Sequence, residues 1–223
     1  MKVGALTIGQ SPRTDIISEI RDILGSDVTI LEKGVLDGLD ISEIQKLFPG
    51  QEEPFLVTRL RDGKEVKLAE RNIIERLPRC ISDLEKEGSE ILILLCTGEF
   101  PEIQSSKVVL RPDRVLMNTA RCVAGCKRLG VLLPAAEQIP VLGRRWEGMY
   151  PDVVMEAVSP YTGSMELVRE KALKFKSANV DLIVLDCLGF NKKTKSIFRE
   201  VTGKPVLLPR TLVARIAREI IEA

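Results

Sequence analysis

The chain of 223 residues contains no histidine. Histidine is the commonest general base near neutral pH and the commonest metal ligand. Its absence excludes Ser-His and Cys-His nucleophile pairs, so any acid–base chemistry must use Cys, Asp, Glu, Lys or Tyr.

Other scarce features narrow the class of protein. Aromatic residues make up only 4%, so we expect a core of Ile, Leu and Val. No apolar run approaches the roughly 20 residues of a membrane span, which argues against a membrane partner. The 33 basic and 32 acidic residues form no basic stripe, which argues against nucleic acid as a partner. Five cysteines without the spacing of a disulfide scaffold predict a reduced, cytoplasmic protein.

Apolar runs alternate with amphipathic stretches, which predicts an α/β fold with mainly parallel sheets. Residues 3–9 align coarsely with 129–134, and 91–96 with 182–186, so we expect two pseudo-symmetric, Rossmann-like lobes that flank a cleft. The expected strands cover residues 3–9, 28–32, 91–96, 108–110, 129–134, 153–158, 182–186 and 205–208. One helix is expected to start at Ser11-Pro12, and others cover residues 70–87, 113–128, 136–147, 165–178, 192–201 and 210–222.

The two halves set the expected domain organisation. Residues 1–127 are expected to form the first lobe and 128–223 the second, with the extreme C-terminus packing on the first lobe. Asp62-Gly63 between two alternating runs predicts a β-hairpin insertion at about 54–68. An exposed hairpin of this kind would suit an interface in a homodimer.

Two cysteines occupy the same place in two similar segments. Each segment has an acidic residue, an apolar run, a cysteine at its end (Cys96 or Cys187) and a glycine two residues later (Gly98 or Gly189). Open α/β sheets bind ligands at the carboxyl ends of their strands. Two thiols in one cleft would suit proton transfer on opposite faces of a substrate, although a lone cysteine is more often a small buried hydrophobe.

The turn after the first strand is a candidate for anion binding. Gln10 and Ser11 lie where a strand ends and a helix begins, so free backbone N–H groups would favour an anion. Arg13 would add a bidentate grip on a carboxylate. The competing interpretation is an ordinary helix cap beside a solvated arginine.

Several other residues have two interpretations each. Glu99 and Asp186 flank the two cysteines, and each would act as a general acid or base or would cap a loop. Glu137 and Gln138 mirror Gln10 and Ser11, and would bind ligand or complement a helix dipole. The remaining cysteines are expected to be structural: Cys80 on an apolar helix face, and Cys122 and Cys126 on one face of another helix, where a metal site is disfavoured.

The motifs together resemble the AroM family over essentially the whole chain. The segments that carry the resemblance are Leu6-Thr-Ile-Gly9, Leu94-Leu-Cys-Thr-Gly98, Leu185-Asp-Cys-Leu-Gly-Phe190 and Pro205-Val-Leu-Leu208. The chain is also similar, more distantly, to the aspartate/glutamate/hydantoin racemase superfamily. That similarity implies two lobes with one cysteine each, no cofactor, and a small carboxylate or related ligand.

The racemase resemblance implies that Cys96 and Cys187 are the catalytic pair. The ligand would be bound by Gln10, Ser11, Arg13, Thr97, Gly98, Leu188 and Gly189. Racemases usually follow the first cysteine with Asn-Thr and the second with Thr, where this chain has Thr97-Gly98 and Leu188. Three hypotheses stay open: a cofactor-independent racemase- or isomerase-like enzyme, a non-catalytic carboxylate-binding protein, and a redox dithiol protein.

Overall fold

The computed structural model describes residues 1–123 and 125–222, which divide into two compact units. The first unit comprises Met1–Asp113 with Val213–Ala223, and the second comprises Arg114–Leu212. The sequence placed the division after residue 127. The structural division falls earlier because α4 (Pro112–Cys122) buries Leu116 and Ala120 in the core of the second unit.

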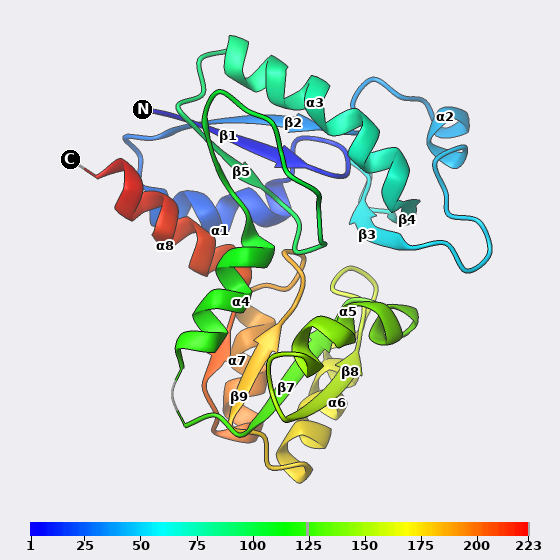
Figure 1. The fold of residues 1–223 in the computed structure, drawn as a ribbon, viewed down its shortest axis with the longest axis vertical. Coiled ribbons are helices and arrows are strands. Elements are labelled where there is room, and N and C mark those ends of the chain that lie inside the picture. Colours follow the sequence, from blue (N-terminus) through cyan, green and yellow to red (C-terminus); the bar gives the residue numbers. More distant parts are fainter. Residues whose placement is uncertain (124, 223) are drawn as a thin grey trace. The chain divides into compact units, whose positions relative to one another are not determined.

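The first unit is built on a four-stranded parallel sheet in the order β2-β1-β5-β6 (Figure 1). Its strands are β1 (Lys2–Thr7), β2 (Thr29–Gly34), β5 (Ile91–Leu94) and β6 (Val108–Leu110). The central strand β5 is buried along its whole length, which is why it reads as a continuous apolar run.

The second unit repeats this topology. Its four parallel strands lie in the order β8-β7-β9-β10, so in both units the first strand of the sheet pairs with the second and the third. The strands are β7 (Arg128–Leu133), β8 (Asp152–Ala157), β9 (Leu182–Leu185) and β10 (Val206–Leu207). This duplication confirms the predicted α/β class with two pseudo-symmetric lobes.

The helices fall between the strands, as expected, with changes at several ends. They are α1 (Thr14–Leu24), α2 (Ile41–Gln45), α3 (Glu70–Lys86), α4, the 3-10 helix η1 (Ala136–Gln138), α5 (Ile139–Glu147), α6 (Met165–Ser177), α7 (Lys192–Thr202) and α8 (Pro209–Ile221). The C-terminal part of α8 (red in Figure 1) runs beside α1, where Arg218 donates to the carbonyl of Leu24 at 2.7 Å.

Two expected helix ends are wrong. The helix α1 begins at Thr14 with Arg13 at its N-cap position, because the Ser11 hydroxyl is bonded to Asp37 instead of capping the helix. The helix α4 ends at Cys122, so Cys122 and Cys126 do not share a helix face. Gly125, with φ +78°, adopts the left-handed conformation that ends regular helix.

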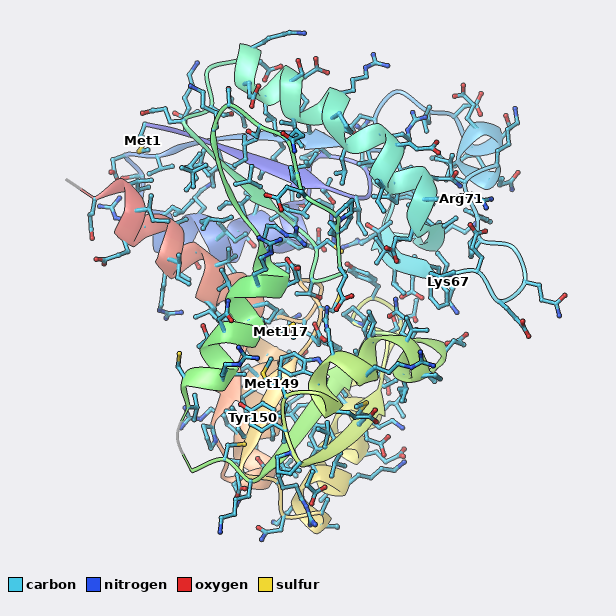
Figure 2. All side chains as sticks on the ribbon, in the orientation of Figure 1. Met1, Lys67, Arg71, Met117, Met149 and Tyr150 are labelled. Atoms are coloured by element: carbon cyan, nitrogen blue, oxygen red, sulfur yellow. The ribbon has the colours of Figure 1, made fainter. Side chains whose placement is uncertain are left out.

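The cores consist mainly of aliphatic side chains, as the low aromatic content predicts. The second unit adds a few large rings: Trp146 is fully buried, and the hydroxyl of Tyr150 donates to the carbonyl of Ala120. Met117 and Met149 pack against the same cluster, and Figure 2 labels both beside Tyr150.

The hairpin insertion is confirmed as the antiparallel pair β3 (Phe55–Arg59) and β4 (Glu65–Ala69). It forms its own two-stranded sheet within the first unit. Within residues 1–123 and 125–222, no helix has the length and apolar character needed to cross a membrane.

Candidate functional site

In the first unit, Cys96 lies just beyond the carboxyl end of β5 and is 9% exposed. The amide of Leu95 donates to the carbonyl of Leu6 at 2.7 Å, which continues the β1–β5 pairing up to the cysteine. The amide of Gly98 then donates to Sγ of Cys96 at 3.3 Å. The chain therefore curls around the sulfur at the edge of the sheet where α/β proteins bind ligands.

In the second unit, Cys187 has the same surroundings beyond β9 and is also 9% exposed. The amide of Asp186 donates to the carbonyl of Leu132 at 2.8 Å. The amide of Gly189 donates to Sγ of Cys187 at 3.3 Å. The two cysteines thus share the same hydrogen-bonding pattern at the strand end and at the sulfur within their units.

A buried arginine holds each cysteine loop. In the first unit, Arg111 donates through Nη2 to the carbonyl of Phe100 at 2.7 Å and through Nη1 to the carbonyl of Pro101 at 3.0 Å. Arg111 also forms an ion pair with Asp113 at 2.8 Å. Because Arg111 directly follows the fourth strand of the sheet, it ties the Cys96 loop to the neighbouring strand end.

In the second unit, Arg210 is 1% exposed and plays the corresponding part. It donates through Nε and Nη2 to the carbonyl of Leu188, at 2.9 and 2.7 Å, and through Nη2 to the carbonyl of Gly189 at 2.8 Å. Sequence reasoning missed both arginines. A usable signal was present, because in each half an Arg and a Pro follow a strand that ends in leucine: Leu110-Arg111-Pro112 and Leu208-Pro209-Arg210.

The turn after β1 is fixed from two sides. Both the amide and the hydroxyl of Ser11 donate to Asp37, at 2.8 and 2.5 Å. On the other side, Arg61 of the hairpin loop donates from its side chain to the carbonyl of Ser11, and its amide donates to Oε1 of Gln10 at 2.9 Å. The turn therefore lies under the hairpin, which the sequence placed at an edge or interface.

Close packing explains why a glycine precedes this turn. A Cβ added to Gly9 would lie 2.5 Å from the carbonyl oxygen of Arg59 and 2.5 Å from Oγ1 of Thr58. Thr58 is 1% exposed, and its hydroxyl has no hydrogen-bond partner in the part of the chain that the structure describes. The hairpin thus brings an extra buried hydroxyl to the predicted ligand-binding turn.

Arg13 forms several hydrogen bonds within the first unit. Its Nε and Nη2 donate to the two carboxylate oxygens of Asp15 at 2.9 and 2.8 Å, and Nη1 donates to the hydroxyl of Thr7 at 3.2 Å. Its side chain is 3% exposed. This bidentate pair fixes the start of α1, and it occupies the guanidinium face that the sequence assigned to a ligand.

The glycine of each cysteine loop packs against a side chain from the segment that follows β2 in the first unit or β8 in the second. A Cβ on Gly98 would meet the Leu56 side chain of β3 at 2.6 Å, and one on Gly189 would meet the hydroxyl of Tyr161 at 2.8 Å. Thr97 and Leu188, between cysteine and glycine, are buried. Leu56 and Tyr161 are therefore additional neighbours of the two thiol loops that the sequence did not reveal.

The acidic neighbours of the cysteines differ in kind. Asp186 is 1% exposed, and its Oδ2 accepts from Nη2 of Arg145 at 2.5 Å and from the indole of Trp146 at 2.8 Å. Glu99 is exposed, and its charge adds to burial in raising the pKa of the half-buried Glu70 at the start of α3. Asp186 thus forms a buried ion pair, whereas Glu99 faces solvent.

The other residues considered in the sequence are Glu137, Gln138 and Cys80. Gln138 is buried and Glu137 exposed in η1. Cys80 is half-buried on α3 and contacts the carbonyl of Gly34 at 3.7 Å, and burial raises the pKa of its thiol. Across residues 1–123 and 125–222, no three Cys, Asp or Glu side chains are grouped as a metal site.

The family model for the AroM protein matches residues 3–221. The chain belongs to the AroM family. No curated protein sequence matches this AroM protein. Its solved structural relatives include allantoin racemase from Klebsiella pneumoniae, with a TM-score of 0.67 at 14% identity over 99% of this chain and 87% of that one.

Two further structural relatives are named for other enzyme activities. Unliganded arylmalonate decarboxylase has a TM-score of 0.64 at 12% identity over 100% of this chain and 94% of that one. Glutamate racemase from Aquifex pyrophilus has a TM-score of 0.59 at 16% identity over 100% of this chain and 84% of that one. At these identities the likeness concerns the fold, and it confirms the expected racemase-like architecture.

Proposed function

We propose that this AroM protein is a cofactor-independent racemase- or isomerase-like enzyme that acts on a small carboxylate. Cys96 and Cys187 would be its paired acid–base groups, one from each lobe, facing a shared cleft. The turn at Gln10 and Ser11 and the two cysteine loops would bind the substrate. The observation that carries the proposal is the glycine N–H contact to each sulfur at equivalent strand ends of a duplicated fold.

The chemistry follows from two thiols of opposite protonation. One sulfur, as thiolate, takes the proton from the carbon next to the carboxylate, and the electron pair moves into the carboxylate as an enediolate. The other sulfur, as thiol, returns a proton to the opposite face of that carbon and becomes the thiolate. The glycine amides that donate to both sulfurs support this role, because an N–H aimed at a sulfur stabilises its negative charge.

The expected substrate class rests on the polar groups of the turn after β1 and of the two cysteine loops. Thr97 and the side-chain amide nitrogen of Gln10 belong to the first lobe and would donate to the substrate carboxylate. A glutamate racemase from Francisella tularensis, determined in complex with D-glutamate, has the same fold at 12% identity. That relationship supports a small carboxylate as the substrate to test first.

A non-catalytic carboxylate-binding protein is the second candidate. Leu188 is 1% exposed and apolar where the racemase pattern has a polar threonine, and Arg13 is held by Asp15. Both observations support a site that would hold a substrate carboxylate less strongly than the racemase pattern implies. This candidate predicts ligand binding that survives loss of either thiol.

Deuterium incorporation from D₂O, followed by proton NMR, distinguishes the two candidates. The panel comprises amino acids, hydantoins, maleate and substituted malonates, each incubated with the wild type and with Cys96→Ser, Cys187→Ser and Cys122→Ser. We expect exchange or conversion of one class, lost in the first two variants and kept in Cys122→Ser, whose thiol is exposed. Turnover in both site variants would refute the thiol mechanism. Binding without turnover would establish the second candidate.

The homodimer predicted from the hairpin is tested separately by sedimentation equilibrium. We expect a mass of about twice 24.8 kDa. A monomer at all concentrations would remove the prediction without touching the proposed chemistry.

A further inference from the structure

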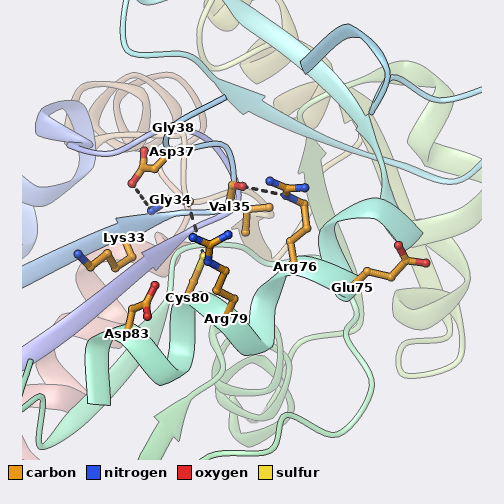
Figure 3. A pocket seen from close by; sticks show the side chains of 10 residues that line it. All are labelled: Lys33, Gly34, Val35, Asp37, Gly38, Glu75, Arg76, Arg79, Cys80 and Asp83. Carbon is orange, nitrogen blue, oxygen red and sulfur yellow. Dashed lines mark hydrogen bonds between the residues drawn. The ribbon is translucent and has the colours of Figure 1, made fainter. Parts of the chain in front are cut away.

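The first unit carries a pocket of about 430 Å³ that is separate from the cysteine loop (Figure 3). It lies between the end of β2 with the turn that follows it and one face of α3. Its charged lining includes Lys33, Arg76, Arg79, Asp37 and Asp83, and the thiol of Cys80 lies among them. A volume of this size is typical of small-molecule sites, for which about 300–1,000 Å³ is usual.

Two guanidinium groups extend from α3 along this pocket. Arg76 donates through Nε to the carbonyl of Val35 at 3.2 Å, and this bond does not use its two terminal nitrogens. Within the described part of the chain, neither Arg76 nor Arg79 forms an ion pair. Residues three apart on a helix project from the same face, so the two forks point to the same side of α3 (Figure 3).

The other charged side chains of the pocket are Lys33, Asp37, Glu75 and Asp83, and the first two of them are engaged. Lys33 pairs with Glu87 at 2.6 Å. The carboxylate of Asp37 accepts from Ser11 and from the amide of Gly34 at 2.7 Å. Asp83 lines the pocket beside Lys33, where it adds an acceptor that would suit a hydroxyl or ammonium group of a ligand. The site thus offers two guanidinium groups to an anionic group of a ligand, and carboxylate oxygens to hydroxyl or ammonium groups elsewhere on the same ligand.

We propose that this pocket binds a phosphate monoester of a small hydroxylated or amino-bearing molecule. A phosphate dianion matches two guanidinium forks with two negative charges and three terminal oxygens, whereas a carboxylate offers one charge and two oxygens. The polar body of the ester would lie against Asp83. The site uses residues of the first unit alone and neither Cys96 nor Cys187, so its failure can be distinguished from failure of the proposed thiol chemistry.

The test is isothermal titration calorimetry of the full chain with glucose 6-phosphate, glycerol 3-phosphate and inorganic phosphate, beside glucose and succinate. Arg79→Gln removes one exposed fork. Arg71→Gln is the matched control, because Arg71 lies on the same helix with its side chain 69% exposed and pairs with Glu53. We expect at least one ester to bind, with affinity about tenfold or more weaker in Arg79→Gln and unchanged in Arg71→Gln.

A second measurement maps the site through Cys80. Alkylation by a maleimide, read for each cysteine by peptide mass spectrometry, is expected to slow at Cys80 and not at Cys122 when the ester is present. Absence of binding by every ester would overturn the proposal. So would equal weakening in both arginine variants, succinate binding as tight as the esters, or unchanged alkylation of Cys80.

Discussion

Substituting Asp186 tests whether the carboxylate before Cys187 is structural or chemical. Asp186→Asn keeps the volume of the side chain and removes its charge. Its partner Arg145 would then remain a cation whose side chain is only 5% exposed. The change therefore removes the Asp186 carboxylate from a buried guanidinium, at a position one residue from a proposed catalytic thiol.

The expected loss follows from the contacts. Oδ2 of Asp186 accepts two bonds, from Arg145 at 2.5 Å and from Trp146 at 2.8 Å. The asparagine oxygen retains one acceptor, so one charge-assisted bond of about 1.5–3 kcal/mol is weakened. Breaking a buried ion pair from one side costs about 3–5 kcal/mol. We expect Asp186→Asn to lower the free energy of unfolding by about 3–5 kcal/mol.

The assay is urea unfolding followed by tryptophan fluorescence. Trp146 is the only tryptophan in the chain and is fully buried in the second unit, so its emission reports on that unit. The matched control is Asp152→Asn. It breaks the ion pair with Arg128, in which both side chains are 45% exposed, and should cost less than about 1 kcal/mol.

A double variant completes the test. In Asp186→Asn with Arg145→Met, both charges are gone, so we expect recovery of at least about 2 kcal/mol relative to the sum of the single losses. Additive losses would refute the ion-pair reasoning, as would an Asp186→Asn cost no larger than that of Asp152→Asn. Full stability with lost turnover would return Asp186 to a chemical role.

The remaining predictions concern the hairpin, a cysteine loop and pH. Gly9→Ala pushes a methyl group into the hairpin backbone and should cost about 1–3 kcal/mol and speed amide exchange of the hairpin, whereas Gly50→Ala, with ordinary contacts, should not. Equal effects would contradict the packing. Arg210→Met removes three donor contacts to the second cysteine loop and should cost about 2–4 kcal/mol in urea unfolding and speed alkylation of Cys187 by mass spectrometry; an unchanged alkylation rate would count against a positioning role. Burial, then the charge of Glu99, raises the pKa of Glu70 above its ordinary 4.5, so its contribution to stability is present below that value and is lost as pH rises through the folded-state pKa. The free energy of unfolding of Glu70→Gln, measured relative to wild type, should therefore be higher at neutral pH than in acid. The same difference at both pH values would contradict the reasoning.

The local patterns of the sequence determined much of the fold. Continuous apolar runs placed the buried parallel strands, because both faces of such strands are covered. The repeated spacing of Cys96 and Gly98 with Cys187 and Gly189 located two equivalent loops, since a strand end and its turn are encoded within a few residues. The hairpin was likewise evident from Asp62-Gly63 between alternating runs.

The hydrogen-bond partners of the polar side chains depend on tertiary contacts. Arg145 and Asp186 lie 41 positions apart, Ser11 and Asp37 lie 26 apart, and Arg210 and Leu188 lie 22 apart. No periodicity links such pairs, because their meeting depends on how strands order themselves in a sheet. For the same reason the sequence could suggest Asp186 as an acid or base, yet only the folded chain brings Arg145 to it and makes it part of the core.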